Sequence, residues 1–130
     1  MRAMRAGSFA LLLCTACSKG DSPAEPEILA ACTRIDIVTV SPGTTPEFDW
    51  SPRCRVGSIL VEPVPRGIGD RWSIRADTNA IAPPLRYGVA PAGVVIHGPY
   101  PLETGIQYRL VIATRGDVTG EAFAIRLFTP

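Results

Sequence analysis

Hydrophobic and polar residues alternate along much of the chain after residue 32, and this spacing is typical of β-strands with one buried face. The alternation is clearest at 106–113 and 121–128. The 12 Gly and 13 Pro leave few long stretches uninterrupted, which disfavours long helices. The segments that we expect to form strands are 34–40, 46–50, 58–63, 71–76, 84–91, 93–98, 106–113 and 121–128.

One motif refines the fold class. The stretch PLETGIQYRLVI contains Leu102, Gly105 and Tyr108 at a spacing that resembles the tyrosine corner of fibronectin type III and other Ig-like domains. In those domains the tyrosine opens strand F, and its hydroxyl bonds to backbone upstream. Trp50 likewise resembles the tryptophan of fibronectin type III strand B. We therefore expect residues 32–130 to be all-β, an Ig-like (fibronectin type III-like) antiparallel β-sandwich of about seven strands.

The N-terminal stretch MRAMRAGSFALLLCTACSKGDSP is typical of a secretory signal. Arg2 and Arg5 precede a short apolar run at 6–13, which is too short to span a bilayer as a helix. Thr15-Ala16-Cys17 then resembles the bacterial lipobox, in which the cysteine is diacylated. The stretches PEFDWSP and PPLRYG also resemble parts of small bacterial lipoproteins with Ig-like domains. The resemblance implies a signal peptide at 1–16 and a lipid on Cys17, which would be the contact with the membrane.

The N-terminal region offers two alternatives to this processing scheme. The sequence Leu29-Ala30-Ala31-Cys32 matches the lipobox pattern well, but Asp21, Glu25 and Glu27 precede it. A signal peptidase needs an apolar segment beside its site, and carboxylates enter hydrocarbon at high cost, so we reject this site. The other alternative is a signal peptide that is cut near Ala16 without lipidation.

Residues 17–31 are polar and contain two prolines, so we expect a flexible tether. Ser18 follows the acyl cysteine. In well-studied lipoproteins an aspartate at this position retains the protein at the inner membrane, and here serine takes its place. The resemblance thus implies a lipid-anchored protein of the bacterial cell envelope, at the outer membrane. The formal net charge is +1 with no block of like charge, which gives no indication of a nucleic-acid partner.

The remaining cysteines, Cys32 and Cys54, form an even pair in an exported chain and are expected to form a disulfide. A hairpin centred on Gly43 places them opposite each other. The bridge would close a loop of about 22 residues and stabilise the fold by roughly 3 kcal/mol. Two reduced, buried thiols are the alternative. A metal site is disfavoured because two cysteines and the distant His97 lack ligand spacing.

The pairing of the last two strands determines how the tripeptide Arg115-Gly116-Asp117 is interpreted. If the alternating residues of 108–112 and 123–127 face one core, Leu110 pairs with Phe123. Gly116-Asp117 then forms a two-residue type II′ turn. The alternative is a binding role, because Arg-Gly-Asp is an adhesion signature and some fibronectin type III modules present it in this same F–G loop.

The sequence contains no convincing catalytic, metal or cofactor site. His97 has no visible base–nucleophile partner. Asp77-Thr78-Asn79 has oxygen ligands but lacks the Gly and distal Glu of a calcium loop. Trp72, Tyr87 and Tyr100 are candidates for a sugar-stacking platform, although such aromatics are more often core residues.

Two functions fit these observations. The first is a lipid-anchored binding or adhesion module that recognises protein or carbohydrate at the cell surface through loops on a rigid scaffold. The second is a structural accessory subunit, without a ligand of its own, that docks onto a larger envelope assembly. We expect neither to be an enzyme.

Acylation at Cys17 predicts that a fatty-acid analogue labels the wild-type chain but not Cys17→Ser. Labelled cells followed by gel fluorescence provide the measurement. Cys32→Ser should keep the label, because Cys32 is the rejected site. Equal labelling of wild type and Cys17→Ser would contradict the prediction.

Overall fold

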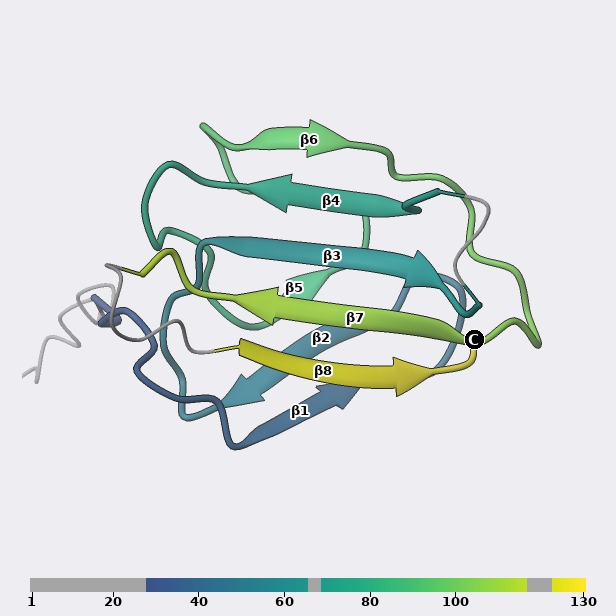
Figure 1. The fold of residues 1–130 in the computed structure, drawn as a ribbon, viewed down its shortest axis with the longest axis horizontal. Helices are drawn as coiled ribbons and strands as arrows, with labels where there is room; N and C mark the ends of the chain where they lie inside the picture. Colours follow the sequence, from purple (N-terminus) through teal and green to yellow (C-terminus); the bar gives the residue numbers. More distant parts are fainter. Residues whose placement is uncertain (1–27, 66–68, 117–122) are drawn as a thin grey trace, which may run out of the picture.

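The computed structural model describes residues 28–65, 69–116 and 123–130. Within these ranges the chain contains eight strands and no helix. The strands form two antiparallel sheets, one of three and one of five strands, which face each other (Figure 1). In the described ranges, no helix is both long and apolar enough to cross a bilayer. The all-β fold class is therefore confirmed.

The first sheet has the order β1-β2-β5 and the second has the order β6-β4-β3-β7-β8. The first comprises β1 (Ile37–Val40), β2 (Glu47–Ser51) and β5 (Leu85–Arg86). The second comprises β3 (Ser58–Pro63), β4 (Trp72–Arg75), β6 (Val95–His97), β7 (Tyr108–Ala113) and β8 (Phe123–Phe128). Neighbouring strands are all antiparallel.

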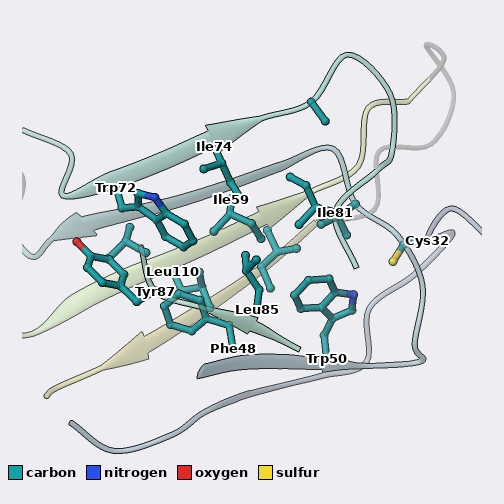
Figure 2. Packing of buried hydrophobic residues seen from close by; sticks show 14 of the residues in the cluster. Cys32, Phe48, Trp50, Ile59, Trp72, Ile74, Ile81, Leu85, Tyr87 and Leu110 are labelled. Atoms are coloured by element: carbon teal, nitrogen blue, oxygen red, sulfur yellow. The ribbon is translucent and has the colours of Figure 1, made fainter. Parts of the chain in front are cut away.

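The core lies between the sheets and is built from alternate residues of each strand (Figure 2). Phe48 of β2 is at its centre, with ring centroids 6.4 Å from Trp72, 6.5 Å from Tyr87 and 5.8 Å from Phe128. Burying one such side chain fully contributes about 1.5–3 kcal/mol. Trp50 is also buried, and its indole N–H donates to the Cys54 carbonyl at 2.9 Å. Aromatic residues from both sheets thus hold the two layers together.

The tyrosine-corner geometry expected from the sequence is confirmed. Tyr108 opens β7 and is fully buried. Its hydroxyl accepts a hydrogen bond from the backbone N–H of Glu103 at 2.9 Å, five residues upstream. Gly105 lies between them at a φ of 85°, which favours glycine. Leu102 is buried beside the corner.

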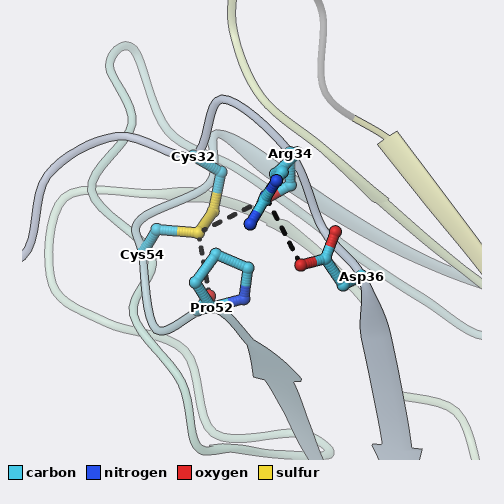
Figure 3. A network of polar contacts seen from close by, with 5 residues as sticks. All are labelled: Cys32, Arg34, Asp36, Pro52 and Cys54. Atoms are coloured by element: carbon cyan, nitrogen blue, oxygen red, sulfur yellow. Dashed lines mark hydrogen bonds and ion pairs between the residues drawn. A yellow bond between two sulfur atoms is a disulfide. The ribbon is translucent and has the colours of Figure 1, made fainter.

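The Cys32–Cys54 disulfide is also confirmed, with a Cα–Cα distance of 4.8 Å (Figure 3). The expected hairpin register was wrong by two residues: Val40 pairs with Phe48 rather than with Pro46, so the hairpin centres on residue 44 rather than Gly43. Pro46 has no N–H to donate to a ladder, and β2 begins after it, at Glu47. 

Cys32 reaches Cys54 by a different route from the expected hairpin. The segment before β1 runs beside the segment that follows β2. Cys32 N–H donates to the Arg55 carbonyl, and Arg55 N–H donates to the Ala30 carbonyl, both at 2.8 Å. These backbone bonds bring the two cysteines together without the hairpin alignment.

The predicted pairing of Leu110 with Phe123 is wrong. Leu110 pairs with Arg126, and Ala113 pairs with Phe123. The connection between β7 and β8 is therefore residues 114–122, so Gly116-Asp117 is not a two-residue turn; residues 117–122 lie outside the described ranges.

With the observed register, the face of β8 that was expected to be buried is the exposed one. Phe123, Ile125 and Leu127 are exposed, whereas Phe128 packs against the core with its ring centroid 5.8 Å from that of Tyr108. Strand alternation defines two faces but does not say which one is buried. Here Phe128 fills the space beside Phe48 and Tyr108, and that contact determines the register.

The corner predicts that Tyr108→Phe lowers the free energy of unfolding by roughly 1–3 kcal/mol, because the Glu103 N–H loses its acceptor, the hydroxyl of the fully buried Tyr108. Urea denaturation measures the change. Tyr100→Phe is the matched control and should stay within about ±0.5 kcal/mol, since Tyr100 is exposed. Equal losses in both variants would show that the hydrogen bond of Tyr108 contributes nothing specific.

Candidate functional site

A hollow of about 350 Å³ lies at the end of the sandwich farthest from the disulfide. Three connections that are distant in sequence form it: β1–β2, β5–β6 and β6–β7. Its volume is within the usual range for small-molecule sites. The lining residues are Thr44, Thr45, Tyr87, Gly88, Pro99, Tyr100, Pro101 and Leu102.

The lining of this end pocket combines rings with hydroxyl groups and includes no charged residue. Tyr100 is 47% exposed and presents an accessible aromatic ring. Thr44 and Thr45 contribute hydroxyls, each of which can donate or accept a hydrogen bond. An aromatic face beside hydroxyl groups suits a neutral ligand that has an apolar ring face and polar edges.

Hydrogen bonds fix the walls of the end pocket. The Tyr87 hydroxyl donates to the Tyr100 carbonyl at 2.6 Å and lies 3.2 Å from the Arg71 carbonyl. The Tyr100 N–H donates to the same Arg71 carbonyl at 2.8 Å, and the Tyr87 N–H donates to the Pro46 carbonyl at 2.8 Å. Tyr87 therefore ties the β6–β7 connection to the core, so the pocket is formed before any ligand arrives.

Gly98 makes this arrangement possible. Its φ is 81°, and a Cβ at this position would lie 2.4 Å from the Arg71 carbonyl oxygen. Any side chain there would displace the backbone that receives the Tyr87 and Tyr100 hydrogen bonds. The glycine is thus a requirement of the pocket, although its sequence context does not reveal this.

The environment of Tyr87 raises its pKa to about 12 from an ordinary value of 10.0. Burial is the largest cause, because it penalises the charged phenolate. The nearby Tyr108 adds to the increase in pKa, while the positive charge of Arg71 opposes it. The hydroxyl therefore remains a hydrogen-bond donor throughout the physiological pH range.

The structure separates the aromatic residues that were grouped as a stacking platform. Trp72 is fully buried and belongs to the core, with its ring centroid 5.2 Å from that of Tyr87. Tyr87 and Tyr100 meet in the end pocket. His97 lies on β6, exposed, with its ring centroid 5.5 Å from that of Tyr100.

Arg115 and Gly116 follow β7 at the opposite end of the sandwich, the end at which the first described residues lie (Figure 1). The Asn79 side chain clamps the Arg115 backbone: its Oδ1 accepts from the Arg115 N–H at 2.7 Å, and its Nδ2 donates to the Arg115 carbonyl at 2.9 Å. A Cβ on Gly57 would lie 2.8 Å from the Arg115 nitrogen. Asn79 thus supports a loop, a role that sequence analysis missed because its partner is 36 residues away.

The structure gives no support to the remaining candidate site residues. Cys17 and Asp117 lie outside the described residues. In the described part of the chain, no group of three or more His, Cys, Asp or Glu side chains could hold a metal ion. Comparison with known proteins returned no matching family model, no matching curated protein and no matching solved structure.

The pKa of Tyr87 predicts a specific loss of stability in alkali. Below pH 10 the hydroxyl is neutral in both folded and unfolded chains, and its contribution is fully present. Between pH 10 and 12 the unfolded chain loses the proton first, so the free energy of unfolding falls as pH rises. Urea denaturation across this range should show a shallower fall in Tyr87→Phe.

Tyr100→Phe is the control for this measurement, because it removes a hydroxyl at an exposed position. It should retain the wild-type dependence on pH. If Tyr87→Phe loses stability with the same slope as the wild type between pH 10 and 12, the raised pKa of Tyr87 is excluded.

Proposed function

We propose that this protein is a lipid-anchored binding module of the bacterial cell envelope, whose ligand occupies the end pocket. The ligand class that the lining favours is a neutral sugar unit of a surface carbohydrate, since its ring can stack on Tyr100 while its hydroxyls meet Thr44 and Thr45. The observation that carries the proposal is a preformed, uncharged aromatic pocket at the end of the sandwich opposite the tether.

The position of the tether follows from the first described residues. Ala31 forms a bridge with Arg55, next to the disulfide and beyond the end of β2. The end pocket contains Thr44 and Thr45, which precede the start of β2. In Figure 1 the dark blue N-terminal part lies at the left, while the β6–β7 connection turns at the right. A module anchored through Cys17 would thus present the pocket away from its attachment.

The strand order supports an Ig-like, fibronectin type III-like identity for the sandwich. Strands β1, β2 and β5 correspond to A, B and E of such domains, and β3, β7 and β8 correspond to C, F and G. Strand β4 extends the second sheet as a C′ strand does in variable-type domains. Tyr108 opens β7, the expected strand F. Domains of this architecture commonly carry their binding loops at the sandwich ends.

Adhesion through Arg115-Gly116-Asp117 is less favoured. Arg115 and Gly116 lie at the tether end, and Asn79 holds the backbone of Arg115 in place. Catalysis is also less favoured, because His97 makes no hydrogen bond to Ser73, its paired residue on β4, within the described residues, and instead contacts the ring of Tyr100. The position of Arg115 and Gly116 supports binding through the opposite end, where the end pocket lies.

A structural accessory role is the second candidate, and the exposed apolar side chains of β8 favour it. Apolar surface of this kind commonly marks contact with another protein. Purification from detergent-solubilised envelope distinguishes the candidates. A constant partner complex would favour the accessory role, whereas sugar binding without a partner would favour the module.

The proposal predicts that the full chain binds neutral hexose or N-acetylhexosamine oligosaccharides on a glycan array. Tyr100→Ala should weaken binding by about tenfold or more, since a lost aromatic contact and its buried area exceed about 1.4 kcal/mol. Val95→Ala, another exposed apolar residue outside the end pocket, is the matched control. Absence of binding to all neutral glycans, or equal affinity of Tyr100→Ala and wild type, would refute the proposal.

A further inference from the structure

A second hollow, the face groove, lies on the outer face of the five-stranded sheet and has a volume of about 430 Å³. Strand β4 lies between β3 and β6 there, and the register places Ser73 between Leu60 of β3 and His97 of β6 (Figure 1). Cross-strand partners share one face of a sheet, and Ile74, on the other face of β4, is buried in the core. The small Ser73 side chain between two larger neighbours therefore leaves a hollow over β4.

The face groove offers hydrogen-bonding groups of every kind. Its polar lining comprises Ser58, Asp70, Ser73, Arg75 and His97. The carboxylate of Asp70 accepts hydrogen bonds, the guanidinium of Arg75 donates them, and the serine hydroxyls do both. Within the described residues Arg75 makes no ion pair and no hydrogen bond, so its donors are available to a ligand. Leu60 and Val111 add apolar surface beside these groups.

The face groove adjoins the end pocket at two points. His97, in the groove, and Tyr100, in the end pocket, have ring centroids 5.5 Å apart. Asp70, in the groove, directly precedes Arg71, whose carbonyl accepts the Tyr100 N–H at 2.8 Å. A chain that leaves the end pocket across Tyr100 therefore enters the groove directly.

We propose that the end pocket and the face groove are consecutive subsites for one oligosaccharide, so that the ligand is an extended glycan rather than a single sugar. The first unit stacks on Tyr100, and the units that follow lie along β4, over Ser73 toward Arg75. Strand geometry puts about 7 Å between residues 73 and 75, so the groove lengthens the site along the sheet. The inference rests on the proposed binding function and adds the chain length of its ligand.

Val95 lies on the edge strand β6, lines the face groove and is 71% exposed. It does not line the end pocket, so a single sugar unit held there does not reach it. Val95→Ala is therefore a control for the end pocket alone, and the face groove needs variants and controls of its own.

The dependence of affinity on glycan length tests the inference. Competition against a labelled tetrasaccharide, with the full chain in detergent, measures the affinity for one to four units of the neutral sugar that binds on the array. In the wild type the affinity should rise by about tenfold or more from one unit to three, because the added units contact the groove. Ser73→Leu fills the groove and should remove this rise while keeping the affinity for one unit. Thr39→Leu, a similar enlargement at an exposed position of β1, should behave as the wild type does.

Arg75→Gln is a second variant, which removes the charged donor without enlarging the side chain. It should reduce the rise in affinity, whereas Arg126→Gln, the same change at an exposed arginine of β8, should not. If no neutral glycan binds, the proposed function and this inference fail together. If the wild type binds one unit and longer chains equally, or if either groove variant keeps the full rise, the inference alone is overturned.

Discussion

Residues 52–57 connect the first sheet to the second, because β2 ends at Ser51 and β3 begins at Ser58. The rest of the structure depends on the bonds that this short connection makes. Cys54 is linked to Cys32, and its carbonyl accepts the indole N–H of Trp50. Val56 exchanges two hydrogen bonds with Ile81, at 2.8 and 3.0 Å. The disulfide and the Val56–Ile81 hydrogen bonds join segments that are far apart in sequence. The short crossing therefore fixes the relative placement of the first described residues and the two sheets.

Features that depend on local spacing or on chemistry could be predicted from the sequence. The β-strands were predicted from alternation, the disulfide from the pairing of Cys32 with Cys54, and the hydrogen bond of Tyr108 from the Leu102–Tyr108 motif. Strand register could not be predicted, because it depends on contacts across the sandwich. Phe128 sets the alignment of β8 by packing between β2 and β7, and no pattern within 123–128 distinguishes its face from the other.

The end pocket illustrates a second limit of sequence analysis. Tyr87 and Tyr100 could be named in advance, but Thr44 and Thr45 join them only because the β1–β2 connection folds to the same end. Gly98 is essential because the backbone of residue 71 approaches it closely, and that approach exists only in three dimensions. Trp72 had the same sequence signature as its aromatic neighbours, yet it lies in the core.

The separation between the end pocket and the tether determines where a ligand can be captured. With Cys17 acylated as proposed, the 13 residues from 17 to 29, which precede the hydrogen bond of Ala30 to Arg55, can extend at most about 45 Å. The rigid sandwich adds its own length, since the pocket is at its far end. On that proposal the end pocket would sample a hemispherical volume above the lipid headgroups, and the contour length of residues 17–29 would set its radius. Shortening the tether would shrink this capture radius without altering a single contact in the binding site.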